Sequence, residues 1–241
     1  MIYKEKFKIG LKDVWKNSQV SNRAILEYLE NIAAYHSDSV GYGVNTSKYT
    51  KLNWLLLHWK VKVIKRPKYG QILDISTWSR NITKCWAYRD FEVYDDDNNL
   101  CVIATSKWIL IEGEDAKLKN VEPEMAEKYQ SKSDKKVFDD EIKKLKAPED
   151  FVSSIKYKVN RKDIDVIGHV HNLCYLDFAY EALPEEVYAK RPFDEFEIMY
   201  KKEIKLGEVV VCKYSKTENG HVVVIQSEDG KFLHAIIELK K

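Results

Sequence analysis

The sequence predicts an α+β fold built from two copies of one unit, in which an amphipathic helix is followed by several antiparallel strands. Three observations lead to this prediction. The same order of signals occurs in both halves of the chain, apolar and polar residues alternate with a period of two downstream of each helix, and a highly charged segment separates the halves. The 241 residues are enough for one or two domains with a substantial core.

Each copy opens with a predicted helix. The first spans residues 23–36 and the second spans residues 173–183, where Pro184 ends it. Asn22 and Asn172 stand in front of these helices as matching predicted N-caps. Apolar positions recur at helical spacing on one face of each helix: Ile25, Leu29, Ile32 and His36 in the first, and Leu173, Leu176, Tyr180 and Leu183 in the second.

Matching strands follow each helix. Residues 59–63 and 196–200 alternate apolar and polar side chains, and a glycine lies eleven positions after the start of each segment, at Gly70 and Gly207. Residues 91–111 and 222–241 each contain two strand-like runs around a polar turn, DDDNN in the first copy and SEDG in the second. Because several spacings agree at once, we interpret the halves as an internal duplication rather than as one large α+β domain with chance similarity.

The predicted organisation has three parts. Residues 1–114 form the first copy, residues 115–150 form a charged and partly helical connecting arm, and residues 151–241 form the second copy. A single sheet with one apolar face needs cover, which the helix supplies. We expect the two sheets to lie edge to edge as an internal pseudo-dimer.

Composition excludes several classes of protein. The 40 basic and 38 acidic residues nearly cancel, which argues against a dedicated nucleic-acid binder, and 44% hydrophobic content argues against a disordered chain. No apolar run approaches a membrane span, and lysines interrupt the first residues where a signal peptide would be apolar. The four cysteines contain no CxxC pair, so we expect four buried thiols in a cytoplasmic protein: Cys85, Cys101, Cys174 and Cys212.

The residues suited to chemistry are concentrated between positions 161 and 186. Asp165 and His169 bracket a glycine-containing turn directly before the second helix. A carboxylate there could orient the imidazole, and the first N–H groups of the helix could stabilise an oxyanion, which together suit acyl transfer to water. The alternative is a capped helix whose histidine only satisfies backbone groups.

Other chemistries fit less well. His169 and His171 have the alternation of a two-histidine metal site, but a turn before a helix would not direct both rings to one point, so we expect no metal and no cofactor. Cys174 falls in the first turn of the apolar helix face and is expected to be a packed thiol rather than a nucleophile. One stretch interleaves aromatic and basic residues, which we interpret as the wet face of a sheet rather than a nucleic-acid surface: Lys60, Lys62, Lys65, Arg66 and Lys68.

Several motifs resemble those of a known family. The string DxDxxGHVxNxxYLxxxxE at residues 163–181 resembles the signature of hotdog-fold thioesterases. The first half is similar to the acyl-acyl-carrier-protein thioesterases, the bacterial relatives of the plant plastid enzymes, through WLL at 54–56, TWS at 77–79, RDF at 89–91 and TSKW at 105–108. The resemblance runs from about residue 7 to residue 238. It implies a tandem hotdog that hydrolyses fatty acyl-acyl carrier protein in fatty acid biosynthesis, with the first copy shaping the acyl site.

The resemblance also implies roles for individual residues. Glu203 would act as base or nucleophile or activate water, His169 would bind or orient the attacked group, and Asp165 would hold the local geometry. Asn172 remains from a pair of asparagines that the family uses near the substrate. The first copy has Gln19 and Arg66 at the positions of His169 and Glu203, so one active site per chain is expected, in the second copy.

One departure from the family pattern matters. The family carries an asparagine where this chain has Ile167, and isoleucine cannot hold a water or a carbonyl group. Activity could persist, be weakened or be lost. Ile167 motivates one alternative, a weakened acyl-binding or regulatory hotdog protein, and the nearest enzyme alternative is an acyl-CoA thioesterase. The expected partners are an acidic acyl carrier protein and a fatty acyl chain. The basic stretch at 60–68 could steer the carrier protein, and the alternative is that it is an ordinary solvated strand face. No nucleic acid or membrane is expected, and a homodimer is left open.

Overall fold

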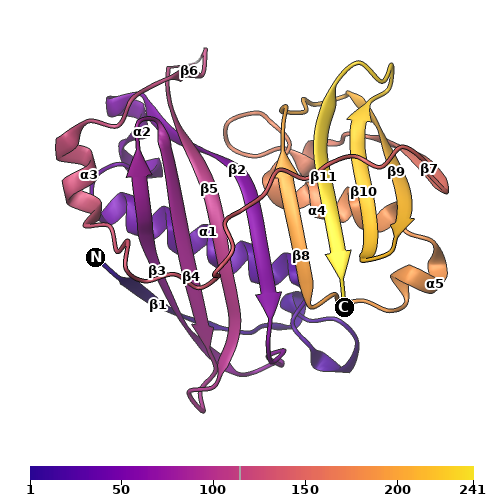
Figure 1. Ribbon diagram of the computed structural model, residues 1–241, viewed down its shortest axis with the longest axis horizontal. Coiled ribbons are helices and arrows are strands. Elements are labelled where there is room, and N and C mark those ends of the chain that lie inside the picture. Colours follow the sequence, from indigo (N-terminus) through magenta and orange to yellow (C-terminus); the bar gives the residue numbers. More distant parts are fainter. Residues whose placement is uncertain (114) are drawn as a thin grey trace. The chain divides into compact units, whose positions relative to one another are not determined.

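The computed structural model describes residues 1–113 and 115–241. The chain divides into two compact units, Met1–Ile142 and Lys143–Lys241, which hold the first and the second copy of the predicted repeat. Figure 1 shows the first unit from indigo to magenta and the second from orange to yellow. The two units meet inside the charged segment, and position 114, our predicted end of the first copy, lies outside the described residues. The three-part division of the chain stays a prediction.

The first unit is an antiparallel sheet with the long helix α1 across one face (Figure 1). Its strands are ordered β1-β3-β4-β5-β2, and the short β6 pairs with β5. The strands are β1 (Tyr3–Lys8), β2 (Leu52–Val63), β3 (Ile72–Thr83), β4 (Trp86–Tyr94), β5 (Leu100–Glu112) and β6 (Lys117–Leu118). The helices are η1 (Leu11–Asp13), η2 (Lys16–Ser18), α1 (Asn22–Ser39), α2 (Val44–Thr50) and α3 (Pro123–Tyr129).

The second unit has the same construction. Its strands are ordered β7-β9-β10-β11-β8, and every neighbouring pair is antiparallel. The strands are β7 (Ser153–Lys158), β8 (Glu195–Tyr200), β9 (Val209–Thr217), β10 (Gly220–Ser227) and β11 (Leu233–Lys240). The helices are η3 (Arg161–Asp163), α4 (Asn172–Glu181) and α5 (Glu185–Tyr188), of which α4 packs on β10 and β11.

Apolar burial explains why these segments fold as they do. Leu26, Leu29 and Ile32 on α1 are fully buried, as the helical spacing requires. In the second unit, Leu176 of α4 is buried together with Ile198 of β8 and Ile237 of β11. Each unit is therefore a helix on an antiparallel sheet, which confirms the predicted α+β class and the tandem hotdog.

The duplication extends to local contacts. Oδ2 of Asp13 accepts the backbone N–H of Gly10 at 2.7 Å, and Oδ2 of Asp163 accepts that of Asn160 at 2.8 Å. Isolated bridges also match, since Gln19 pairs with Lys68 in the first unit and His169 pairs with Lys205 in the second. These pairs fix the correspondence between the copies residue by residue.

The predicted helix caps are off by one residue. The N-cap of α1 is Ser21, whose Oγ accepts the N–H of Ala24 at 3.1 Å, and the N-cap of α4 is His171. Asn22 and Asn172 are instead the first residues of their helices. The serine hydroxyl satisfies an N–H group that the helix leaves without a partner, which places the start of α1 after Ser21.

The part of the charged segment before residue 143 packs on the first unit. The carbonyl of Lys135 accepts Nε1–H of Trp78 at 3.0 Å, and the ammonium of Lys135 lies 2.8 Å from Glu92. Arg80 pairs with Glu141 at 2.8 Å. These contacts hold residues 131–142 against β3 and β4, although their composition suggests a solvated linker.

Three of the four cysteines are buried, and Cys85 is half-buried, so our expectation of four buried thiols is wrong for Cys85. All four are free thiols. Over residues 1–113 and 115–241, no helix is both long enough and apolar enough to cross a membrane.

Candidate functional site

The turn that precedes α4 is closed by backbone hydrogen bonds. Asp165 N–H donates to the carbonyl of His169 at 2.8 Å, and Gly168 N–H donates back to the carbonyl of Asp165 at 3.1 Å. Gly168 has a φ of +92°, in the left-handed region that a side chain would disfavour. The turn therefore needs this glycine, and it presents His169 directly before the helix.

The side chain of Asp165 supports the same turn. Its Oδ1 accepts the N–H of Ile167 at 2.9 Å and the N–H of His169 at 3.2 Å. A carboxylate that bonds to backbone N–H groups two and four residues onward is a local turn-stabilising arrangement. Asp165 thus acts on the backbone that carries His169.

Glu203 lies beyond the end of β8, in a segment without strand structure. Its segment runs beside the turn before α4. His169 forms a bridge with Lys205, and the N–H of Val170 donates to the carbonyl of Ile204 at 2.9 Å. The side chain of Glu203 is exposed and that of His169 is half-buried. The fold therefore brings the segments that carry His169 and Glu203 together, although these two residues are 34 positions apart in the sequence.

Two tyrosines connect α4 with the segment that carries Glu203. The hydroxyl of Tyr175 donates to the carbonyl of Lys202 at 3.4 Å, and the hydroxyl of Tyr200 donates to the carbonyl of Asn172 at 3.1 Å. Burial raises the pKa of Tyr175 well above its usual value, and the negative charges of Glu203, Glu208 and Asp165 raise it further. Tyr175 therefore stays protonated at neutral pH and keeps its hydroxyl as a donor. Our sequence analysis assigned it no role.

The N-terminus of α4 differs from that of α1. His171 at the N-cap of α4 makes no side-chain capping hydrogen bond, whereas Ser21 caps α1. The first N–H groups of a helix carry partial positive charge and attract anions. Asn172 occupies the first position of α4, three residues after His169.

The corresponding region of the first unit is built differently. Arg66, at the position of Glu203, donates from Nη1 to the carbonyl of Val20 at 2.9 Å and to Oδ1 of Asn22 at 3.0 Å. Gln19 stands at the position of His169. A guanidinium that bonds to the helix start cannot act as a base, so the first unit has no His–Glu pair in this region.

Two family profiles account for nearly the whole chain. The profile "Acyl-ACP thioesterase N-terminal domain" matches residues 1–129, and "Acyl-ACP thioesterase C-terminal domain" matches residues 146–240. This chain belongs to the acyl-ACP thioesterase family. The resemblance that we drew from the motifs is confirmed.

Curated members of the family are distant in sequence. The chain is 25% identical over 225 residues to "Oleoyl-acyl carrier protein thioesterase 1, chloroplastic" of Arabidopsis thaliana, covering 86% of this chain and 62% of that protein. It is 23% identical over 222 residues to "Dodecanoyl-[acyl-carrier-protein] hydrolase, chloroplastic" of Umbellularia californica, covering 87% of this chain and 58% of that protein. The chain thus spans about three-fifths of the length of these relatives.

Solved structures of the family share the fold along the whole chain. An acyl-ACP thioesterase from Bacteroides thetaiotaomicron superposes with a TM-score of 0.88 at 21% identity, covering 99% of this chain and 97% of that one. The 12:0-ACP thioesterase from Umbellularia californica superposes with a TM-score of 0.85, also at 21% identity, covering 99% and 96%. Both comparisons support the tandem hotdog.

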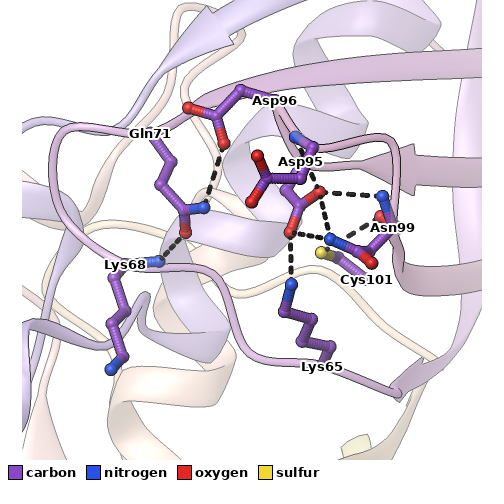
Figure 2. Close-up of polar contacts among 8 residues, drawn as sticks. Lys65, Lys68, Gln71, Asp95, Asp96, Asn99 and Cys101 are labelled. Atoms are coloured by element: carbon purple, nitrogen blue, oxygen red, sulfur yellow. Dashed lines mark hydrogen bonds and ion pairs between the residues drawn. The ribbon is translucent and has the colours of Figure 1, made fainter.

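We expected the basic stretch of this thioesterase-family chain to be the solvent-exposed face of one strand. This expectation is wrong for the part of the stretch after Val63. β2 ends at Val63, so Lys65, Arg66 and Lys68 lie in the loop that follows the strand. Lys65 pairs with Asp95 at 2.8 Å, as Figure 2 shows, and Arg66 bonds to the start of α1. Lys65 and Arg66 are thus engaged within the first unit, which weakens the case for this stretch as a carrier-protein surface.

The turn between β4 and β5 holds a group of carboxylates. Among the described residues, Asp95, Asp96 and Asp97 are the one set of potential metal ligands that lie close together. Figure 2 shows that Asp95 is already occupied, because its oxygens accept from Lys65 and from Asn99. His169 and His171 do not belong to such a group.

Proposed function

We propose that this chain hydrolyses the thioester of fatty acyl-acyl carrier protein and releases the free fatty acid. The observation that supports this function best is the contact between the His169 turn and the Glu203 segment at the start of α4, where the first unit has Gln19 and Arg66. The names of the relatives, which are oleoyl- and dodecanoyl-carrier-protein thioesterases or hydrolases, agree with it. No cofactor is needed for this chemistry. Four free thiols support a cytoplasmic location.

The proposed reaction needs a base, an oxyanion site and a proton for the leaving thiol. Glu203 takes a proton from water, and the water oxygen attacks the thioester carbonyl carbon. The carbonyl oxygen becomes an oxyanion, which the first N–H groups of α4 stabilise. The carbon–sulfur bond then breaks, and the leaving pantetheine thiolate takes up the proton that Glu203 received from water, so that Glu203 is a carboxylate again and the products are a carboxylic acid and a thiol.

The other site residues have supporting roles in this proposal. His169 orients the attacked carbonyl from the turn that Asp165 holds, and Asn172 contacts substrate from the first position of α4. The first unit, which carries no His–Glu pair in the equivalent region, shapes the binding of the acyl chain. The carrier protein, which carries the acyl chain on its phosphopantetheine thiol, docks through cationic side chains.

Thiol release from carrier-protein and CoA thioesters across a range of acyl chain lengths tests the proposal. We expect hydrolysis of carrier-protein thioesters at higher kcat/KM than CoA thioesters of the same chain length. The reverse ranking would favour an acyl-CoA thioesterase, and no thiol release from any substrate would refute the proposed function.

Single substitutions test the roles proposed for Glu203 and His169. Glu203→Gln and His169→Ala should each lower kcat by about 10²–10⁴-fold, the range for loss of a general acid or base. Glu208→Gln is the matched control, because Glu208 is another exposed carboxylate beside the same turn and accepts the N–H of Lys205 at 3.0 Å. Full activity in Glu203→Gln would show that another group serves as the base.

A second candidate function is acyl binding with weakened catalysis. Ile167, at the position of the family asparagine, is 70% exposed and cannot hold a water or a carbonyl. Ile167→Asn should then raise kcat many-fold above a low wild-type value. If the wild type is already fast and the variant equals it, this second candidate is wrong.

A further inference from the structure

We propose that Tyr175 and Tyr200 form a pair of positioning residues that holds the Glu203 segment in register against the start of α4. We call these two residues the tyrosine pair. This inference rests on the proposed function, because it assigns the pair a purpose in the reaction at Glu203. Tyr175 is the tyrosine of the motif at residues 163–181, which carried no role for it, and Tyr200 lies outside that motif.

The hydroxyls of the pair cross between two elements in opposite directions. Tyr175 stands on α4 and donates to the carbonyl of Lys202, the residue next to Glu203, at 3.4 Å. Tyr200 ends β8 and donates to the carbonyl of Asn172, the first residue of α4, at 3.1 Å. The two rings pack edge to face with centroids 5.2 Å apart. Each element is thus fixed by a side chain from the other.

Both side chains are buried, with 3% of Tyr175 and 8% of Tyr200 exposed. A buried hydroxyl without a partner is costly, so each tyrosine favours the one backbone arrangement in which its hydroxyl reaches a carbonyl. Glu203 itself is exposed and lies in a segment without strand structure. The backbone beside it is therefore held by the pair together with β11, where the carbonyl of His234 accepts the N–H of Lys201 at 2.8 Å and Nδ1 of His234 lies 3.1 Å from the carbonyl oxygen of Lys202.

The first unit has no equivalent of the tyrosine pair and holds the corresponding loop by a different contact. Its equivalents of Tyr175 and Tyr200 are Ile25 and Val63, neither of which has a hydroxyl. There, the loop after β2 is held by Arg66 itself, which bonds to Val20 and Asn22. A glutamate at that position cannot donate to those carbonyl oxygens. The second unit therefore needs another connection between loop and helix, and the tyrosine pair supplies it.

Kinetics of the full chain test this assignment. We expect Tyr175→Phe and Tyr200→Phe each to lower kcat about fivefold to tenfold with little change in KM, and the double variant to lower it about 50-fold, because a misplaced catalytic group loses rate more than affinity. Tyr214→Phe is the matched control, since it removes a hydroxyl that bonds to His221 Nδ1 at 3.0 Å in the same unit. An unchanged kcat in the double variant, or an equal loss in Tyr214→Phe, would overturn the proposal.

A second comparison separates positioning from general stability. In the background Glu203→Asp, whose carboxylate is already displaced by a shorter stem, the double tyrosine variant should cost markedly less than in wild type. An equal cost in both backgrounds would show that the pair does not act through Glu203. Unfolding midpoints of all variants should fall by similar small amounts, including that of Tyr214→Phe.

Hydrogen exchange provides a readout that does not depend on activity. The N–H of Val170 bonds to the carbonyl of Ile204, so its exchange rate reports whether the Glu203 segment stays in place. Exchange at Val170 should be at least tenfold faster in the double tyrosine variant than in wild type and unchanged in Tyr214→Phe. Unchanged exchange in the double variant would refute the pair as a positioning device. Faster exchange in a chain that hydrolyses no thioester would refute the proposed function alone.

Discussion

Nη1 of Arg66 lies 3.0 Å from Oδ1 of Asn22, which closes the loop after β2 onto the first turn of α1. The equivalent loop of the second unit carries Glu203 beside His169. The loop beside the helix N-terminus thus carries different side chains in the two units. In the first unit an arginine bonds to the helix start, and in the second unit the corresponding position of the loop carries an exposed glutamate. The copies differ at the positions where a loop meets a helix N-terminus, while their sheets keep the same strand order.

The first prediction concerns this arginine. Arg66→Met removes a donor from Asn22, whose side chain is only 1% exposed, and should lower the free energy of unfolding by about 1–3 kcal/mol, the usual cost of a buried polar group that loses its partner. Urea denaturation measures the change. Lys68→Met, an exposed cation two residues later, should have almost no effect. Equal stability of the two variants would show that the Arg66 contacts contribute nothing.

The second prediction concerns a buried histidine in the first unit. Nδ1 of His36 lies 2.7 Å from Nη1 of Arg89, and since arginine donates, His36 accepts as a neutral ring. Burial, and then the charge of Arg89, lower the pKa of His36 to about 3. An unfolded histidine has a pKa of about 6.5, so the unfolded chain binds one more proton below that pH. Stability should therefore be full above pH 6.5 and fall as the pH drops toward 3.

The slope of this loss is about 1.4 kcal/mol per pH unit at most, because one proton is involved. The variant His36→Gln keeps an acceptor for Arg89 but cannot ionise. The two pKa values set a window from about pH 3 to about pH 6.5. Urea unfolding at a series of pH values between 4 and 6.5 should show a shallower pH dependence for this variant than for wild type. Parallel pH profiles of the two proteins would mean that His36 is not neutral in the folded chain.

The third prediction concerns the turn between β4 and β5. The ammonium of Lys65, and then the N–H groups of Asn99, hold the pKa of Asp95 well below its usual range (Figure 2). An aspartate with a lowered folded pKa stabilises the protein above its unfolded pKa of about 3.9, and this stabilisation is lost as the pH falls toward the folded value. Asp95→Asn should therefore lower Tm at pH 7, and its difference from wild type should shrink below pH 4.

Asp97→Asn is the control for this turn, because the exposed carboxylate of Asp97 is adjacent in sequence while its backbone N–H donates to Asp95 Oδ1 at 3.1 Å. Thermal unfolding of the three proteins at pH 7 and pH 3.5 gives the comparison. A difference between wild type and Asp95→Asn that stays constant over this range would contradict the role of the ionised carboxylate.

The repeat and its strands could be predicted because they depend on local patterns. Alternation along residues 59–63 and 196–200 reports burial on one sheet face, and β2 and β8 contain these segments. The sequence does not distinguish the N-cap of α1, since Ser21 and Asn22 are both good caps and only the Oγ contact with Ala24 decides between them. The N-cap prediction for α1 is therefore wrong by one residue because two adjacent residues have side chains that can accept a helix N–H group.

The surroundings of Glu203 could not be predicted for a different reason. The charged residues after Tyr200 continue a strand-like pattern, but the strand ends there, and the tyrosine hydroxyl bonds to Asn172, 28 positions away. Tyr175 falls among the apolar residues of α4 and its contact with Lys202 spans 27 positions. Long-range contacts of single polar atoms leave no periodic signal in the sequence.

The fourth prediction separates two roles for Asp165 in the proposed reaction. Its Oδ1 accepts the N–H groups of Ile167 and His169, contacts that an amide oxygen can also make. Asp165→Asn should therefore retain kcat within about threefold, whereas Asp165→Ala should lose about 10- to 100-fold because the turn that carries His169 loses two hydrogen bonds. Rates on one carrier-protein thioester at saturating substrate give the comparison. If both variants lose activity equally, the charge of Asp165 acts in the reaction itself, and its role is more than that of a support for the turn.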